Sequence, residues 1–308
     1  MAKARSRILD YLAYLVVRLA IALMQMLTDR AVRQLAFSLA WLGYHADWRH
    51  RQVADDSLRH AFPDLDVEQR DKLVRGCFRH FALLITEIAR MPRKLHVGNW
   101  RQHVELVSGE ILAKAMTSGR SCLLVGAHFG NWELAGYTMG LLGFRTNAIA
   151  RPLDNPYLDR FLRKFREGTG QRVLAKKGDF DQMSDLLAGG GLLATLADQD
   201  AGQRGLFVDF FSRPASTHKA VALMALEYDV PLLVGGVPRV GEPMRYQVMI
   251  EDVIEQAEYA ERPDAVQAIT QRFTSALERL IRRYPEQYFW LHRRWKHQPN
   301  AKKAKRAA

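Results

Sequence analysis

The chain has 308 residues, 48% of them hydrophobic and 25% charged, which excludes a disordered or fibrous protein and allows a substantial buried core. Its formal net charge of +12 at pH 7 indicates attraction to an anionic partner, such as a nucleic acid, an anionic membrane or an acidic protein. Cys77 and Cys122 lie in apolar surroundings without the spacing of a disulfide framework or a zinc site. A reducing cytosolic environment fits this cysteine content best.

The first 30 residues contain an apolar helical segment, YLAYLVVRLAIALMQML at 11–27, which Arg18 and Gln25 interrupt. A spanning helix needs about 20 apolar residues, and a central charge costs about 2.5 kcal/mol or more on insertion scales. We therefore interpret residues 1–30 as a membrane-associated helix that contacts the bilayer or inserts shallowly. A spanning helix and a core helix remain the alternatives, and the leading basic residues would favour the cytosolic side on insertion.

Residues 31–96 are predicted to be a helical region that packs on the rest of the protein, because apolar residues recur there at helical spacing. Within it, Asp66 and Gln69 follow Pro63 in the pattern of a capping box, which predicts the start of a helix. At the other end of the chain, residues 297–308 form a basic tail, which we expect to be flexible and able to touch anionic lipid.

Short apolar runs alternate with helical patterns after Trp100, which predicts an α/β core at residues 97–296. The expected strands are SCLLVGAH, TNAIAR, GLLATLAD, PLLVGGVPRV and RYQVMIEDV. The expected helices are NWELAGYTMGLLG, NPYLDRFLRKFREGTG, FDQMSDLLAGG, STHKAVALMALEYD and DAVQAITQRFTSALERLIRRYP. The predicted fold class is α/β, with a central mixed, mostly parallel sheet flanked by helices and a helical N-terminal region.

The stretch LLVGAHFGNWELAG, residues 123–136, holds the most informative pair of polar residues. His128 and Glu133 lie five positions apart, so on one continuous helix they would point about 140° apart, at about 100° per residue. If a strand instead ends at His128, and Asn131 caps a helix that begins at Trp132, both side chains can face one crevice at the carboxyl end of the strand. Ligands bind at such crevices in open α/β sheets, and the helix dipole would keep Glu133 ionised.

A carboxylate on one imidazole nitrogen would fix the tautomer of His128 and leave the other nitrogen free as a general base. No serine or cysteine nucleophile stands at a comparable turn, so this base would activate a hydroxyl of the substrate. The alternative is a core histidine with satisfied hydrogen bonds beside an ordinary helix-start glutamate. The interpretation as a metal site has even less support, because two ligands at this spacing have no obvious third ligand.

The sequence GAHFGNWE resembles the HX4D/E signature of glycerolipid-type acyltransferases, in the form carried by the bacterial lipid A biosynthesis lauroyl and myristoyl acyltransferases. Further stretches are similar to blocks of that family in the same order, and the resemblance covers nearly the whole chain. These stretches are LRHAFPDLDVEQRDKLVRGCFRHFALLITE, IARPLDNPYLDRFLRKFR, LADQDAGQRGLFVDFFSRPAST, PLLVGGVPR and RRYPEQYFWLHRRWK.

The resemblance implies an O-acyltransferase that takes a fatty acyl chain from an acyl thioester, usually acyl carrier protein, and places it on a hydroxyl of a lipid A precursor. His128 would remove the hydroxyl proton, and Glu133 would orient and stabilise the imidazolium. No metal or cofactor is implied. The expected location is the cytoplasmic face of the inner membrane, where the basic surface would meet anionic lipid and the acidic carrier protein.

The same resemblance suggests substrate-binding residues. Arg151, which closes a predicted strand, aligns with an arginine that the family uses near the phosphate or glycan head group, and Arg166 is a second candidate. Asp198 and Asp200 would lie on one side of an extended segment and could hold Arg151 or sugar hydroxyls. Asn131 is the remaining candidate beside the catalytic pair. The alternative for Arg151 is an ordinary surface arginine, and the alternative for Asp198 and Asp200 is a polar segment where a strand passes into a loop.

Ser212 departs from the resemblance, because the family usually has glycine after its paired phenylalanines. This departure casts doubt on the shape of the loop that would lie near the acceptor, and therefore on the identity of the acceptor. Phe207, Phe210 and Phe211 are candidates for the wall of an acyl groove, although aromatic residues at this spacing more often form plain core.

Two other functions compete with this interpretation. The same chemistry could serve another glycolipid or a lysophospholipid, with acyl-CoA as the possible donor. A non-catalytic basic protein that binds membrane or RNA is more remote. Nucleic acid is not expected as a partner, because the chain lacks RRM, KH and zinc-knuckle patterns and does not interleave exposed aromatic residues with its basic ones.

Overall fold

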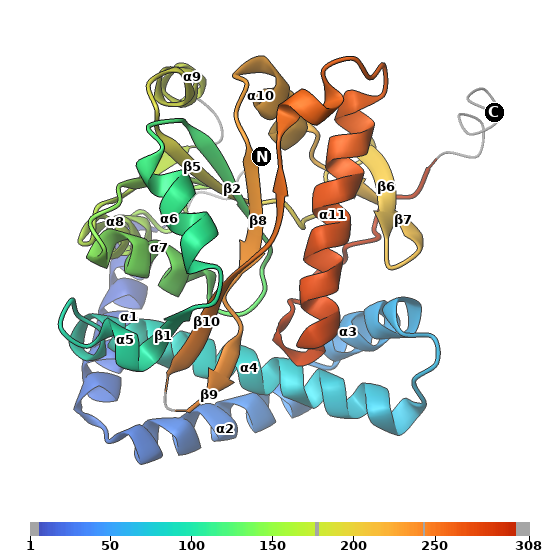
Figure 1. Ribbon diagram of the computed structural model, residues 1–308. Helices are drawn as coiled ribbons and strands as arrows, with labels where there is room; N and C mark the ends of the chain where they lie inside the picture. Colours follow the sequence, from blue (N-terminus) through green and yellow to red (C-terminus); the bar gives the residue numbers. More distant parts are fainter. Residues whose placement is uncertain (1–5, 176–178, 243, 300–308) are drawn as a thin grey trace.

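A central sheet organises the computed structural model, which describes residues 6–175, 179–242 and 244–299 (Figure 1). Its strand order is β1-β10-β8-β2-β5-β3-β4, with β9 paired to β10. The strands are β1 (Val104–Leu106), β2 (Cys122–Gly126), β3 (Thr146–Ala150), β4 (Gln171–Ala175), β5 (Leu192–Leu196), β8 (Leu232–Gly236), β9 (Arg239–Gly241) and β10 (Arg245–Ile254). Strands β8, β2, β5, β3 and β4 are parallel, and β10 runs antiparallel to β8. The predicted mixed, mostly parallel sheet is confirmed.

Helices flank this sheet, as the sequence predicts. They are α5 (Trp100–His103), α6 (Gly109–Thr117), α7 (Trp132–Leu141), α8 (Pro156–Glu167), α9 (Phe180–Ala188), α10 (Ala220–Glu227) and α11 (Ala265–Arg283), with short 3-10 turns at Gln256–Tyr259 and Pro285–Gln287. Helix α11 packs on β8 and β10, whereas α7 and α8 pack against β4 at the other end of the sheet. The apolar stripe of α11, which includes Ile269, Phe273 and Leu280, is fully buried.

Four helices occupy the N-terminal region: α1 (Arg7–Met26), α2 (Asp29–Ala46), α3 (Trp48–Ala61) and α4 (Val67–Lys94). The long α4 lies along α2 and passes below the sheet (Figure 1). The predicted capping box is present, because the Asp66 side chain accepts from the N–H of Gln69 while the Gln69 side chain accepts from the N–H of Asp66. Helix α4 also contributes buried polar side chains to the site described below.

Helix α1 is long and apolar enough to cross a membrane, and among its residues only Asp10 is buried. It rests on α8 through a cluster of aromatic rings, with Tyr11 and Tyr157 at 5.2 Å between centroids. Arg18, which interrupts the apolar run, lies over the Phe161 ring at 5.0 Å and donates to the Tyr14 hydroxyl at 2.9 Å. The charge within this apolar run is therefore turned toward the protein. The basic residues at 1–5 and the end of the tail at 300–308 lie outside the described residues.

A two-stranded hairpin, β6 (Leu206–Phe210) and β7 (Arg213–Thr217), stands apart from the main sheet. Phe211 and Ser212 form its turn with φ values of 52° and 56°, a left-handed conformation that glycine adopts most easily. This explains why a glycine is usual at position 212, and the serine departs from it at a tight turn. Phe210 and Phe211 are 2% and 3% exposed and belong to the main core, and Phe211 also lines a cavity beside Phe62. Their place in an acyl groove stays a prediction. Phe207 is partly buried on the same strand.

Candidate active site

The turn between β2 and α7 places His128 at the carboxyl end of a central strand. Strand β2 ends at Gly126, and Asn131 caps α7 by accepting from the N–H of Leu134 at 3.0 Å. Gly130 has φ +60°, and a Cβ atom there would meet the Val237 carbonyl oxygen at 2.1 Å. Only glycine fits such a close approach in a left-handed conformation. The predicted arrangement of strand, turn and capped helix is present.

Three backbone hydrogen bonds hold this turn to the segments beside it. The carbonyl of His128 accepts from the N–H of Phe289 at 3.0 Å, the N–H of Gly130 donates to the carbonyl of Gln287 at 3.0 Å, and the N–H of Asn131 donates to the carbonyl of Val237 at 2.8 Å. These three bonds fix the backbone of the turn and so the position from which the His128 side chain extends. Its side chain is 22% exposed, so it can meet a substrate.

Asp198 is the direct partner of the His128 ring. Its Oδ1 lies 2.8 Å from Nδ1 of His128, and its Oδ2 accepts from the backbone N–H of His128 at 3.0 Å. Burial would lower the pKa of His128, but the charge and hydrogen bond of Asp198, with a contribution from Glu133, raise that pKa above its usual value. With Nδ1–H donating to Asp198, the lone pair of Nε2 is available to accept a proton. Asp198 therefore orients the His128 ring, whereas the sequence suggested that it holds Arg151 or a sugar.

Glu133 lies in the first turn of α7, as expected, but its carboxylate is engaged by Arg166. Nε of Arg166 donates to Oε2 of Glu133 at 2.9 Å and Nη2 donates to Oε1, which makes a forked ion pair between α8 and α7. The expectation that a Glu133 oxygen orients the imidazole is therefore corrected: Asp198 does so. Glu133 acts on His128 through its charge.

A second histidine and aspartate pair adjoins the first. Asp200 Oδ2 lies 2.6 Å from Nδ1 of His297, and the N–H of Asp200 donates to Nε2 of His292 at 3.1 Å. Since Nε2 accepts, a neutral His292 carries its proton on Nδ1 and offers a donor there. Burial lowers the pKa of His292, which favours the neutral ring. Oδ1 of Asp200 is buried and has no hydrogen-bond partner among the described residues.

Arg294 was not singled out from the sequence, although it lies within a block that carried the resemblance. Its side chain is buried and donates to the Ser216 carbonyl and to Thr217 Oγ1, the latter at 2.6 Å. Burial lowers the pKa of Arg294, while Tyr288 and Asp198 act in the opposite direction. This cation is part of the charge environment that keeps the pKa of Asp198 low despite burial of that carboxylate.

A buried polar network beneath the turn was also missed by sequence reasoning. Arg239 forms a forked pair with Glu87 and donates to Nδ1 of His80 at 3.2 Å, while Nε2 of His80 lies 3.2 Å from the Gly130 carbonyl oxygen. The Tyr246 hydroxyl donates to Glu87 and accepts from Arg239 at 3.0 Å. Helix α4 is thereby connected to the His128 turn.

The other two expected binding residues, Arg151 and Asn131, bond to partners other than His128. Arg151 directly follows the end of β3, but its side chain is 82% exposed and pairs with Asp154 at 3.2 Å. Asn131 is fully buried, because it caps α7 and donates to the Tyr246 hydroxyl at 3.3 Å. Among the residues that the structure describes, no three histidine, cysteine, aspartate or glutamate side chains are grouped as metal ligands would be.

The fold and the site define an α/β protein with a carboxylate-oriented histidine at the carboxyl end of a central strand. Residues 2–297 match the model of a family described as bacterial lipid A biosynthesis acyltransferase. The chain belongs to this family and is an acyltransferase.

Curated proteins of related function are similar to the chain over most of its length. The lipid A biosynthesis palmitoleoyltransferase of Escherichia coli is 27% identical over 256 residues, which are 82% of this chain and 80% of that protein. The lipid A biosynthesis lauroyltransferase of the same organism is 26% identical over 255 residues, with the same two shares. A phosphatidylinositol mannoside acyltransferase of Mycolicibacterium smegmatis is 27% identical over 169 residues, 54% of this chain and 55% of that protein.

Proposed function

We propose that this acyltransferase moves a fatty acyl chain from an acyl thioester on acyl carrier protein to a hydroxyl of a lipid A precursor, with His128 as the general base. The proposal depends chiefly on one observation: Asp198 engages Nδ1 of His128 and leaves Nε2 for the substrate. The names of the two Escherichia coli relatives support an acceptor of the lipid A type.

In the proposed reaction, Nε2 of His128 takes the proton of the acceptor hydroxyl as its oxygen attacks the thioester carbonyl carbon. The C–S bond then breaks, the new ester C–O bond remains, and the departing thiolate receives the proton from the imidazolium. Asp198 stabilises the imidazolium because its carboxylate is ionised and lies 2.8 Å from Nδ1. Glu133 adds a second negative charge near the ring and holds Arg166 in place.

Substrate contacts are proposed for residues that share the edge of the sheet with His128. Strands β2, β5 and β3 are parallel, so their carboxyl ends carry His128, the Asp198–Asp200 segment and Arg151 to the same edge. The exposed guanidinium of Arg151 suits a phosphate or glycan head group. Oδ1 of Asp200, which has no hydrogen-bond partner in the part of the chain that the structure describes, suits a donor from the substrate, such as a hydroxyl.

A membrane location is part of the proposal. Helix α1 exposes large apolar side chains, including Ile8, Val16 and Leu19, to the surroundings of the protein. The net charge of +12 would draw this surface to an anionic bilayer and to an acidic carrier protein. We place the enzyme at the cytoplasmic face of the inner membrane, where the lipid acceptor is accessible.

The similarity to a phosphatidylinositol mannoside acyltransferase supports a second candidate, which is the same chemistry on another glycolipid. In that case acyl-CoA would also be tested as donor. The geometry of His128 and Asp198 would serve either acceptor, since the base acts on any hydroxyl presented at Nε2.

Acyl transfer by the purified full chain tests the proposal. Wild type would be incubated with a lipid A precursor and either acyl carrier protein or CoA charged with different chains, and the products would be weighed by mass spectrometry. We expect one acyl mass gain, reduced about 10²- to 10⁴-fold in His128→Ala. His50→Ala is the matched control, because the His50 side chain is 49% exposed and pairs with Asp47, the residue that caps the same helix. Full activity in His128→Ala would refute the base, and transfer to a different glycolipid alone would refute the acceptor.

A further inference from the structure

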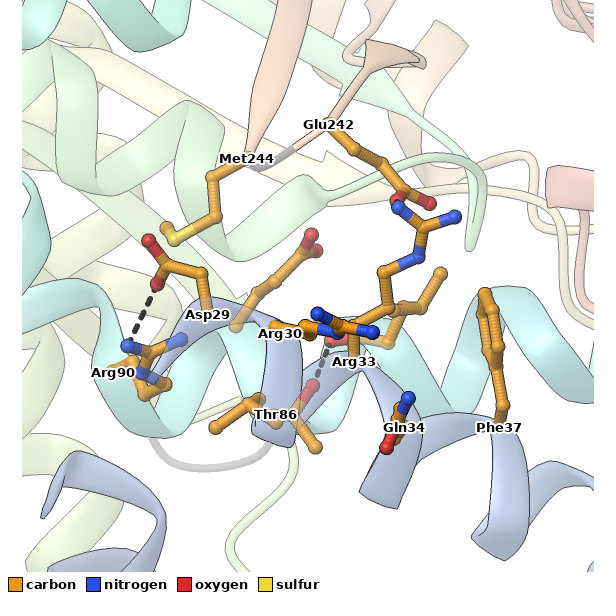
Figure 2. Close-up of a pocket in the computed structure, with 12 residues that line it drawn as sticks. Asp29, Arg30, Arg33, Gln34, Phe37, Thr86, Arg90, Glu242 and Met244 are labelled. Carbon is orange, nitrogen blue, oxygen red and sulfur yellow. Dashed lines mark hydrogen bonds and ion pairs between the residues drawn. The ribbon is translucent and has the colours of Figure 1, made fainter. Parts of the chain in front are cut away.

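A cavity of about 520 Å³ lies between α2 and α4 (Figure 2), and His128 is not among the residues that line it. Its walls carry three arginines, Arg30, Arg33 and Arg90, together with the apolar side chains of Val32, Phe37 and Leu83. Glu242 and Met244, from the turn between β9 and β10, close the side that faces the sheet. A cavity of this size with a mixed lining suits a small amphiphilic ligand.

The lining carries three arginines and three carboxylates, and two further cations behind it, Lys94 and Arg239, leave the surroundings of the cavity with an excess of positive charge. Each lining carboxylate is already neutralised by at least one cation. The pairs are Asp29 with Arg90 at 2.7 Å and Lys94 at 3.0 Å, Glu87 with Arg239, and Glu242 with Arg33 at 2.6 Å. Arg30 has no carboxylate within 4 Å among the described residues. The Arg33–Glu242 pair has side chains 54% and 31% exposed, so it contributes little stability and an incoming anion can take the place of Glu242.

Helix α2 presents these groups as one stripe. At about 100° per residue, Arg30, Gln34, Phe37 and Trp41 lie within a sector of about 60° around the axis of α2. The guanidinium of Arg79, from α4, lies 5.1 Å from the Phe37 ring and that of Arg33 lies 5.3 Å from it. Trp41 is 64% exposed, and exposed tryptophan is typical of the boundary between lipid tails and water. The stripe passes from cationic to aromatic along α2.

The cavity also lies where lipid head groups would be. Helix α1 ends at Met26 and α2 begins at Asp29, so Arg30 follows the apolar helix after only a short connection. Met26 and Leu27 at this end are exposed. Head groups occur at the level of the polar end of a membrane-contacting helix, and a cation there attracts anionic lipid.

We propose that this cavity binds an anionic phospholipid, with the phosphate on Arg30 and Arg33 and the glycerol and upper acyl chain against Phe37, Leu83 and Met244. The proposal rests on the membrane attachment proposed above, but not on acyl transfer. It assigns the α2–α4 cavity to a lipid that holds the enzyme at the bilayer, separate from the acceptor that meets His128.

Binding of a soluble lipid tests this assignment without a membrane and without turnover. Isothermal titration calorimetry of the full chain would use dihexanoyl phosphatidylglycerol below its micelle concentration, with dihexanoyl phosphatidylcholine and inorganic phosphate as comparisons. We expect phosphatidylglycerol to bind at least about tenfold more tightly than either. The choline cation of phosphatidylcholine would be repelled by the arginines, and inorganic phosphate lacks the apolar groups that would contact Phe37 and Leu83. Equal affinities for the two lipids would overturn the charge argument, and inorganic phosphate binding as tightly as the lipid would overturn the lipid assignment.

Variants locate the binding. Arg30→Gln combined with Arg33→Gln should weaken phosphatidylglycerol at least about tenfold, and Gln34→Trp should weaken it by obstruction with every charge kept. Arg49→Gln combined with Arg59→Gln is the matched control, because both residues are exposed on α3 and Arg59, like Arg33, pairs with a carboxylate. An equal loss in the control would show that net charge, and not the cavity, binds the lipid. Lipid binding by a chain that transfers no acyl group would refute the proposed function and leave this site intact.

Discussion

One carboxylate, Asp198, binds both the ring and the backbone of His128: Oδ1 lies 2.8 Å from Nδ1, and Oδ2 accepts from the backbone N–H at 3.0 Å. Two contacts from a single buried side chain define the position of the ring more closely than either could alone. They also decide the tautomer, since an acceptor on Nδ1 keeps the proton there and frees Nε2.

Asp198→Asn should lower kcat by about 10²- to 10⁴-fold, because an amide no longer favours the active tautomer or stabilises the imidazolium. The sign of the pH effect is also defined. Asp198 raises the pKa of His128, and a base is active only when deprotonated, so activity in wild type should rise with pH through a value above 6.5. In Asp198→Asn that acidic limb should move to lower pH. An unchanged pH profile of kcat/KM would show that another group is the base.

Glu133→Gln should destabilise the protein by about 3 kcal/mol, because it leaves the Arg166 cation without its partner at a site where both side chains are largely buried. A double-mutant cycle with Arg166→Gln, measured by denaturant unfolding, should give a coupling energy of about 0.5–3 kcal/mol. Activity separates the two roles of Glu133. If its charge also assists His128, Glu133→Gln should lower kcat more than Arg166→Gln does; equal losses would mean that Glu133 serves only to hold Arg166.

His292→Asn and His292→Gln distinguish two uses of one ring. The amide nitrogen of asparagine can replace Nδ1–H, whereas the amide oxygen of glutamine can replace the acceptor Nε2 that binds the N–H of Asp200. We expect the Nδ1–H donor to stabilise the oxyanion that forms at the thioester carbonyl, so glutamine should cost about 10²- to 10³-fold in kcat and asparagine less. The opposite order, with kcat kept in the glutamine variant, would assign His292 to positioning of Asp200.

Local features of the site could be read from the sequence because they depend on neighbours along the chain. The apolar run that ends at His128, the cap at Asn131 and the capping box at Asp66 each involve residues within a few positions of one another. The order of the strands in the sheet, by contrast, depends on contacts between residues that are far apart in the sequence. Strand β2 lies beside β5 with Gly126 opposite Leu196, so residues two positions further on, His128 and Asp198, meet.

The spacing within HFGNWE instead suggested that Glu133 touches the imidazole. The forked guanidinium of Arg166, 33 residues away in sequence, competes for that carboxylate and binds it. The network of His80 and Arg239 could not be predicted for the same reason, because these two residues are 159 positions apart in the sequence. Strand β4 was missed because it is a short edge strand with an exposed arginine, Arg172, within it. Tertiary neighbours, not periodicity, decide each of these features.

Gly130→Ala should displace the His128 turn. The added Cβ would lie 2.1 Å from the Val237 carbonyl oxygen, and φ +60° would strain any other residue by about 1–2 kcal/mol even without the contact. Gly143→Ala is the control, because Gly143 has φ +86° but a Cβ added there would have no atom within 4 Å. We expect both variants to lose stability in thermal unfolding and only Gly130→Ala to lose most of its kcat. Normal kcat in Gly130→Ala would show that the turn can shift without moving the base.

His80 should make the protein sensitive to mild acid. Burial, and the positive charge of Arg239 at 3.2 Å, lower the pKa of His80 to about 3. Because the unfolded chain binds this proton below about pH 6.5 and the folded chain does not until about pH 3, stability should fall as pH drops through this interval. The slope for one such group is about 1.4 kcal/mol per pH unit.

Denaturant unfolding at pH 6.5 and pH 5, with His80→Gln as the comparison, measures this contribution. Glutamine keeps a donor that can reach the Gly130 carbonyl, but it does not titrate. The His80→Gln variant should therefore lose less stability than wild type between pH 6.5 and pH 5. His292, whose pKa is also lowered, should account for part of the slope that remains. Parallel losses in wild type and His80→Gln would mean that His80 takes up its proton in the folded protein, and that its hydrogen bond to Arg239 is not maintained in solution.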